Sequence, residues 1–267
     1  MKPLLDLYRA QFATTLATQL QYRVSAAIWL IAAVLQPIVY LVVWSAVARS
    51  NGGSVGDYTR AAFAGYFIVT MLVNYVTDTW VMYVFDMRIR DGSFSPMLLR
   101  PVHPIHADIA ENVTHKLIQS SVMLPAAVGL AFAFRPALHP QPWAVLAFLP
   151  ALVLAWALCF LTGWTLALAS FWTTRVSAIN QMYYVVELFL SGRVAPLTLF
   201  PSPIQALATL LPFRWIVAFP VELLLGRLSR AEALSGFAAQ SLWLALDLAL
   251  LRLIWRAGLR RYSAVGA

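Results

Sequence analysis

Long apolar stretches separated by short polar segments form the main pattern of this chain. Six such stretches occupy residues 24–48, 61–85, 117–134, 143–171, 178–190 and 234–254. A helix needs about 20 apolar residues to cross the hydrocarbon layer, and only a helix satisfies its own backbone hydrogen bonds there. We therefore predict an all-α membrane protein with six transmembrane helices, of which the 178–190 helix is the shortest.

The segment before the first span has a helical pattern of its own. Apolar side chains recur every four residues, at Leu4, Tyr8, Phe12, Leu16 and Leu20. The charged side chains of this segment fall largely away from that stripe. The spacing predicts an amphipathic helix over residues 1–23 that lies on the cytoplasmic membrane surface. The alternative is a simple extension of the first span.

The region between the fifth and sixth spans is apolar but broken. Prolines interrupt it at positions 196, 201, 203, 212 and 220. Proline removes a helical hydrogen bond and restricts the residue before it. The pieces are too short to cross a bilayer separately, so residues 192–232 are predicted to form a hairpin of short helices at the outer face.

Composition agrees with a membrane protein. The chain has 267 residues, of which 61% are hydrophobic and 11% are charged, against about 45–50% and 25% in soluble domains. With six spans, both termini share one side, and that side holds twelve of the 19 Lys and Arg residues. The positive-inside rule makes this side cytoplasmic. The net charge of +8 therefore reflects topology, not nucleic-acid binding.

Motifs for catalysis, nucleotide binding and redox chemistry are absent. The sequence has no GxxxxGK[ST], HExxH, CxxC or GxSxG, and its single cysteine has no internal partner. His103, His106 and Asp108 form the one polar group that suggests a metal site or a membrane-embedded enzyme. We favour a solvated helix end there, and expect no metal and no cofactor on this chain.

Two segments resemble the permease subunits of ABC-2-type ABC exporters. They are "RDGSFSPMLLRP" at residues 90–101 and "PLTLFPSPIQALATLLPFRWIVAFPVELLLG" at residues 196–226. Their form is closest to the multidrug or viologen exporter branch. With the predicted helix order, the resemblance spans residues 1–267 as one permease domain in the cytoplasmic (inner) membrane.

This resemblance implies a transporter subunit without an ATPase domain, and not an enzyme. It implies that two copies of a separate ATP-binding subunit bind ATP and Mg and supply the energy. It also implies a second permease, either another copy of this chain or a related one. The expected cargo is an amphipathic small molecule or a lipid, moved outward.

The resemblance makes residues 86–104 the cytoplasmic coupling loop that contacts the ATP-binding subunit. The expected contact residues are Arg88, Arg90, Asp91, Gly92, Phe94, Met97, Leu98 and Arg100. The arginines suit carboxylates on a partner, the apolar side chains suit a knob, and the aspartate suits a helix cap. The alternative is an ordinary basic loop that anchors the topology.

Polar residues within spans two and five are the candidates for a substrate pathway. They are Asn74, Asp78, Tyr83, Asn180, Tyr183, Tyr184 and Glu187. Carboxylates beside aromatic rings suit a cationic or amphipathic molecule, and the resemblance also places these two spans at the pathway. The alternative is interhelical hydrogen bonding that holds the bundle together.

Two polar pairs precede the third span. Glu111 and His115 are four residues apart, as are Asn112 and Lys116. We interpret them as a polar helix extension with a structural ion pair.

A different function class remains open from the residues alone. A stand-alone transporter coupled to protons through Asp78, Glu187 or Asp247 needs no ATPase partner. Such folds often contain internal repeats, and no convincing repeat relates the first three spans to the last three. A co-purifying ATPase separates this alternative from the exporter.

Overall fold

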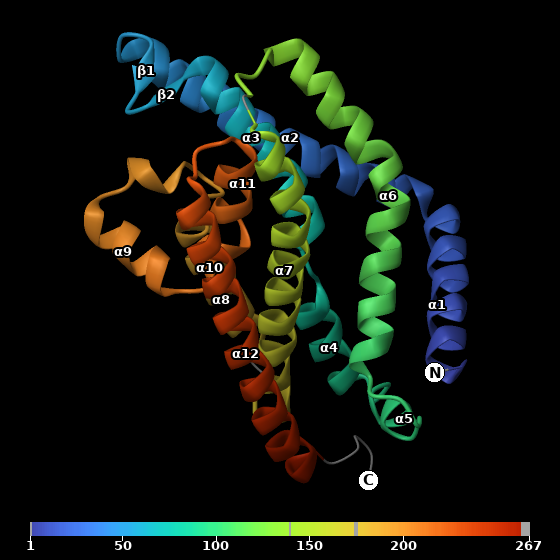
Figure 1. Cartoon of the computed structure of the whole chain (residues 1–267). Helices are drawn as coiled ribbons and strands as arrows, with labels where there is room; N and C mark the ends of the chain where they lie inside the picture. Colours follow the sequence, from blue (N-terminus) through green and yellow to red (C-terminus); the bar gives the residue numbers. More distant parts are fainter. Residues whose placement is uncertain (1, 139, 174–175, 263–267) are drawn as a thin grey trace.

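The computed structural model describes residues 2–138, 140–173 and 176–262, and nearly all of the regular structure is helical. Figure 1 shows an elongated bundle with both ends of the chain at the same end of the molecule. The long helices are α2 (Arg23–Ser50), α3 (Arg60–Thr77), α6 (Ile105–Phe134), α7 (Pro142–Ala167) and α12 (Arg230–Arg261).

The predicted fifth span forms a helix close to its predicted bounds of 178–190, but this helix is too short to count as a full span. Five segments in the described ranges are long and apolar enough to cross a membrane: 27–50, 60–90, 105–134, 142–171 and 230–261. The predicted fifth span is α8 (Val176–Leu190), which has 15 residues. At about 1.5 Å per residue it falls short of the ~30 Å hydrocarbon layer. The sequence pattern therefore overstated the number of full-length spans.

The predicted second span is interrupted. Helix α3 ends at Thr77 and α4 (Val81–Arg90) begins four residues later, and Asp78 has extended backbone with ψ of 141°. The amine of Lys116 donates to the carbonyl oxygens of Tyr75, at 2.9 Å, and Asp78, at 2.7 Å. A helix that ends within a membrane needs such partners for its free carbonyls, so Lys116 stabilises the interruption.

The N-terminal segment is helical, as predicted. Helix α1 (Lys2–Gln21) lies alongside α6 (Figure 1) and is separated from α2 by Tyr22. Phe12 and Leu20 of the predicted apolar stripe are exposed, whereas Thr15 is buried. The position of Leu4 on that stripe lies outside the described side chains. A position in the membrane surface stays a prediction.

Short elements form the end of the molecule opposite the termini (Figure 1). Two strands that the all-α prediction omitted, β1 (Ser54–Val55) and β2 (Tyr58–Thr59), pair between α2 and α3. The proline-broken region forms η2 (Leu197–Leu199), α9 (Ser202–Leu210), α10 (Phe213–Ile216) and α11 (Ala218–Leu224). Prolines occupy the first turns or caps of α9 and α10, where a missing N–H costs little. The prediction of short helices here is confirmed.

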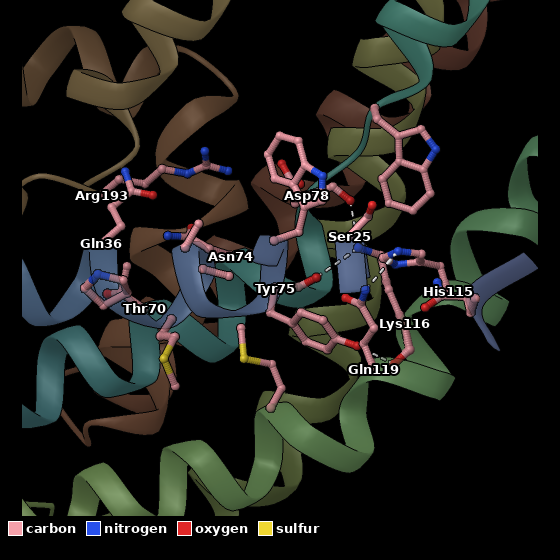
Figure 2. A pocket seen from close by; sticks show the side chains of 18 of the residues that line it. Ser25, Gln36, Thr70, Asn74, Tyr75, Asp78, His115, Lys116, Gln119 and Arg193 are labelled. Carbon is pink, nitrogen blue, oxygen red and sulfur yellow. Dashed lines mark hydrogen bonds between the residues drawn. The ribbon is translucent and has the colours of Figure 1, made fainter. Parts of the chain in front are cut away.

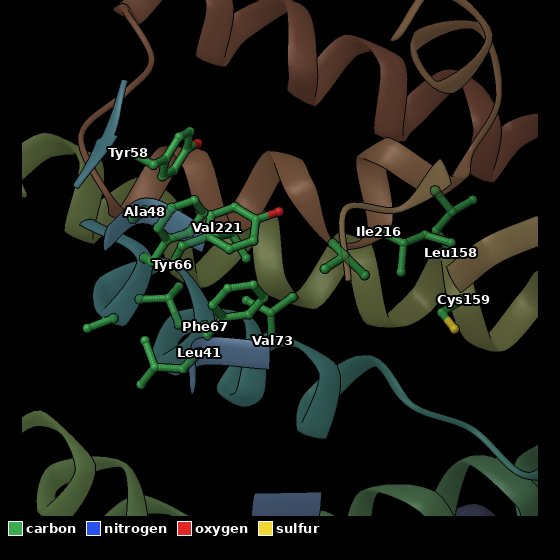
Figure 3. Packing of buried hydrophobic residues seen from close by; sticks show 14 residues of the cluster. Leu41, Ala48, Tyr58, Tyr66, Phe67, Val73, Leu158, Cys159, Ile216 and Val221 are labelled. Carbon is green, nitrogen blue, oxygen red and sulfur yellow. The ribbon is translucent and has the colours of Figure 1, made fainter. Parts of the chain in front are cut away.

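An aromatic core joins this end to the bundle. Tyr58, Tyr66 and Phe67 pack with Val221 of α11 and residues of α2 and α7 (Figure 3). The Tyr66 hydroxyl donates to the carbonyl of Gly192 at 2.6 Å. Gly192 has φ of +89°, and a Cβ there would lie 2.7 Å from the Tyr66 oxygen. Only glycine fits this close approach.

At the end that holds both termini, a second cluster supports the predicted coupling loop. Helix α5 (Ser95–Leu98) follows α4, and η1 (Leu168–Phe171) follows α7. Phe85, Phe94 and Trp164 are fully buried there and pack with Phe171 and Trp255. The loop is thus fixed to α7 and α12 by aromatic side chains.

Candidate substrate cavity and coupling segment

A cavity of about 720 Å³ lies among α1, α2, α3, α6 and α8. Part of its wall is polar and part apolar. The polar wall in Figure 2 includes Asn74, Asp78, His115, Lys116 and Arg193. The cavity lies along the second half of α3 and the middle of α6, both of which belong to candidate membrane spans. Concave sites of this size, largely apolar with a few polar groups, are typical of small-molecule binding.

Lys116 is the charged centre of one end of the cavity. The Tyr75 hydroxyl donates to the backbone carbonyl of Lys116, while the lysine amine bonds the two carbonyls at the α3–α4 interruption. Its amine lies 5.8 Å from the centre of the Tyr75 ring and 6.0 Å from that of Trp80. The sequence interpretation gave Lys116 a structural role on a polar extension, and missed that it faces a cavity. The third span was predicted to begin at residue 117, whereas the apolar helix covers 105–134, so the sequence interpretation placed Lys116 just outside the membrane. Its rarity, as one of only two lysines, was the remaining signal.

The predicted pairing of Asn74 with Asp78 on one helical face needs correction. Helix α3 ends before Asp78, whose N–H still bonds the Asn74 carbonyl at 2.8 Å. Both side chains nevertheless line the cavity. Asp78 is exposed to it, and the Asn74 Oδ1 is buried without a hydrogen-bond partner in the described part of the chain.

Glu187 does not reach the cavity as a free carboxylate. It is buried and pairs with Arg193, with 3.1 Å between Oε1 and Nη2. Arg193, which the sequence interpretation missed, lines the cavity and is itself 8% exposed. Burying one of these charges without the other is strongly unfavourable, so each depends on its partner.

The other predicted pathway residues differ in whether they line the cavity. Tyr184 lines the cavity, whereas Tyr183 packs against Phe213, with 5.6 Å between ring centres. Asn180 is half-buried and lies outside the lining, and Tyr83 is 70% exposed on α4. Asn74, Asp78 and Tyr184 therefore share the cavity, and the remaining candidates do not.

The first predicted coupling residue, Arg88, is half-buried and belongs to an ion-pair network. Its guanidinium lies 2.6 Å from Asp108 and 3.8 Å from Glu111. The other Asp108 oxygen accepts a 2.8 Å hydrogen bond from the Trp164 indole. Arg88 had been predicted to contact a partner protein, but in this structure its guanidinium is engaged with these two carboxylates. It joins α4 to α6 and α7 instead, and Glu111 pairs with Arg88 where His115 had been expected.

The next residues form a tight turn at the surface. Arg90 pairs with Asp86 at 2.8 Å but leaves much of its side chain exposed. Asp91 ends α4 and accepts from the N–H of Ser93 at 2.9 Å, so it caps a turn and not the start of α5. Hydrogen bonds from the Ser93 hydroxyl and N–H lower the pKa of the Asp91 carboxyl. Gly92 has φ of +76°, which favours glycine.

The apolar side chains that were predicted to contact the partner, Phe94, Met97 and Leu98, are not the most exposed ones of this segment. Phe94 is fully buried in the aromatic cluster, because α5 folds back onto η1 and α12, so it offers nothing to a partner. Met97 and Leu98 are partly buried against the same cluster. Leu99, which sequence reasoning passed over, is 87% exposed and adjoins the exposed Arg100. A hydroxyl contact of 2.7 Å between Ser95 and Tyr262 ties this segment to the end of α12.

The polar group at the start of α6 is fully used in packing. His103 lies against Trp255, with 4.4 Å between ring centres, and its Nδ1 accepts from the N–H of Ile105 at 3.2 Å. Burial lowers the pKa of His103. Asp108 is paired as described, and His106 contacts Tyr8 edge-on. No three potential ligands converge on a metal site within the described residues.

A family model described as "ABC-2 family transporter protein" matches residues 34–266. The chain belongs to this family. No curated protein sequence matches the chain. As an ABC-2 transporter protein it is a multi-pass membrane subunit of an ABC transport system, and such permeases lack an ATPase domain. In general they act as dimers with an ABC ATP-binding partner.

Within this ABC-2 subunit the two sites described above are physically connected. Arg88 joins the segment before α5 to Asp108 on α6, and the cavity residue Lys116 lies two helical turns further along α6. The other end of α4 adjoins Asp78, which also lines the cavity. Two helices, α4 and α6, therefore connect the α5 segment to the cavity.

Proposed function

We propose that this chain is the transmembrane subunit of an ATP-driven exporter that moves an amphipathic small molecule or lipid outward across the cytoplasmic membrane. The observation that supports this most directly is the exposed pair Leu99 and Arg100 on a rigid, aromatic-packed segment next to the cavity helices. Exposed apolar side chains with a charged rim are typical of protein interfaces.

The partners follow from this arrangement. Two copies of a separate ATP-binding subunit, which hold ATP and Mg, dock on the α5 segments of two permeases. The second permease is another copy of this chain or a related one. The exposed apolar faces of α2 and α8 are available for it, with Trp29, Ile31, Met182 and Val185 among their exposed side chains.

The proposed orientation places the α5 end in the cytoplasm. That end has both termini (Figure 1) and a cluster of arginines at the end of α12, including Arg260 and Arg261. The positive-inside rule supports this choice. Five crossings alone would place the two termini on opposite sides of the membrane. In this orientation, α8 and the hairpin that follows it therefore form a sixth crossing. Assignment to the multidrug or viologen branch belongs to this proposal as well.

The proton-coupled alternative has less support. Glu187 is tied to Arg193, and the buried Asp247 accepts from the Thr162 hydroxyl. Two of its three candidate carboxylates are therefore engaged with other side chains of the bundle.

The test is affinity purification of the tagged chain from its native host in mild detergent, followed by mass spectrometry. We expect an ABC ATP-binding subunit in near-equal amount. A second, related permease in the same sample indicates a heterodimer, and its absence indicates a homodimer. A folded chain that purifies alone contradicts the proposal and favours the gradient-driven transporter.

A further inference from the structure

Two opposite charges face the cavity without forming an ion pair. In the described ranges, neither Lys116 nor Asp78 has an oppositely charged group within salt-bridge distance. Lys116 donates to two neutral carbonyls, and an ammonium group has three donors, so one remains. Both residues belong to candidate membrane spans, where charges are costly unless they are paired. Each charge therefore offers a binding point.

The neighbouring wall also lacks hydrogen-bond partners. Arg193 is more than nine-tenths buried, and its Nε has no partner among the residues that the structure describes. The same holds for the Oδ1 of Asn74. Figure 2 shows Asn74 and Asp78 between Arg193 and Lys116. The polar wall thus presents acceptors between two cationic groups.

The rest of the cavity suits a hydrocarbon chain. Its apolar lining includes Ala32, Ala33 and Pro37 of α2, with Met71 of α3 and Met123 of α6, and these two methionines pack in one cluster. Methionine side chains adapt to flexible apolar ligands. A ligand that fills both parts has a polar head and an apolar tail.

We infer that the cavity binds a zwitterionic amphiphile whose head group has a primary ammonium and a phosphate or carboxylate. This inference rests on the proposed export function, because it names the cargo of that exporter. The acidic group accepts hydrogen bonds from Lys116 and the Arg193 side of the wall. The ammonium donates to the carboxylate of Asp78 and to Asn74. The tail lies along the alanines and methionines described above.

A primary ammonium fits better than a quaternary one. Quaternary ammonium groups have no N–H and are held by free aromatic faces. The Trp80 ring contacts Lys116 and the His115 ring, and the Tyr75 ring contacts Lys116. The rings of Trp29 and Tyr184 also line the cavity and are exposed, so the preference for a primary ammonium rests on the acceptor groups and not on the rings. The acceptors Asp78 and Asn74 instead require N–H donors.

The experiment measures lipid binding to the purified full chain in detergent by native mass spectrometry. The probes are lysophospholipids with identical acyl chains and ethanolamine, choline or glycerol head groups. Soluble phosphoethanolamine, which has the same head without a tail, is added as a competitor. The variants are Asp78→Asn, Lys116→Gln and Lys116→Arg. Arg252→Gln, at an exposed position of α12 outside the cavity lining, is the control.

We expect the ethanolamine lipid to bind about tenfold more tightly than the other two, the usual effect of one hydrogen bond to a charged group. Asp78→Asn should remove its advantage over the glycerol lipid. Lys116→Gln should weaken both, while Lys116→Arg retains binding and shows that the fold tolerates substitution. The control should match the native chain, and phosphoethanolamine should not compete.

Equal affinity for all three head groups overturns the inference, as does tighter binding of the choline lipid. Unchanged binding in Asp78→Asn and Lys116→Gln excludes the cavity as the site. If phosphoethanolamine competes at equal concentration, the acyl tail does not contribute to binding, and the proposed amphiphile is wrong. Because this assay needs no ATP-binding subunit, its failure is distinct from a failure of the purification test for the proposed function.

Discussion

At the scale of single residues, the Arg88 network makes a sharp stability prediction. Replacing Arg88 with Met leaves the buried Asp108 carboxylate without its 2.6 Å partner. Removal of one member of a buried pair costs roughly 3–5 kcal/mol. Arg100→Met changes an exposed arginine that forms no salt bridge in the described part of the chain, and it should cost about 1 kcal/mol or less. Thermal unfolding of both variants in the same detergent checks this, and equal losses would show that the network is not structural.

His103 gives the stability of the chain a pH dependence. Burial lowers the pKa of His103 in the folded state, so the unfolded chain takes up the proton more readily. Stability therefore decreases as pH falls below about 6.5, the ordinary histidine pKa. It levels off once the pH is below the folded-state pKa. In His103→Asn, which keeps an acceptor for the Ile105 N–H, this part of the pH dependence should disappear. Thermal unfolding from about pH 7 to about pH 5 measures the difference, and an identical slope in both proteins contradicts it.

Residue roles were the least predictable feature of this sequence. Charge and spacing drew attention to Asp78 and Asn74, which do face the cavity. The same criteria made Arg88 and Phe94 partner contacts, yet both are enclosed by helices distant in sequence. Packing against α7 and α12 determines which face of the short helix is buried. The local sequence of that helix does not predict this packing.

At the scale of elements, close helix packing around glycine is testable. A Cβ on Gly236 of α12 would lie 2.0 Å from the Phe219 ring of α11, whereas one on Gly129 of α6 meets nothing within 4 Å. Gly236→Ala should therefore destabilise the protein by roughly 1–3 kcal/mol through overpacking. Gly129→Ala should be neutral or stabilising by about 0.5–1 kcal/mol, since alanine favours helix. Thermal unfolding compares them, and equal midpoints would mean that Phe219 moves aside freely.

The elements themselves were largely predictable, because hydropathy and proline placement act locally. The long helices, the N-terminal helix and the short outer helices all follow the sequence pattern. The interruption at Asp78 did not, because its stabilising partner, Lys116, is supplied by a different helix. Helix α8 (Val176–Leu190) follows the predicted 178–190 closely, and only its count as a full-length span was wrong. It continues into the outer hairpin, which packs against α7 and α12.

At the scale of the whole molecule, two helices connect the cavity to the α5 segment. Helix α4 adjoins the cavity at Asp78 and the α5 segment at Asp91, and α6 contacts both through Lys116 and Asp108. Docking at the surface is therefore expected to change the shape of the cavity.

The last prediction concerns the exposed leucine that follows α5. Leu99→Asp places a charge on the 87% exposed apolar side chain next to Arg100. If an ATP-binding subunit buries this position, its retention in affinity purification should fall about tenfold or more, as for a central interface residue. Leu210→Asp makes the same chemical change on an exposed leucine of α9, at the opposite end of the molecule, and should retain the partner. Equal retention in both variants would place the docking surface elsewhere, whereas equal loss would indicate a general effect of the added charge.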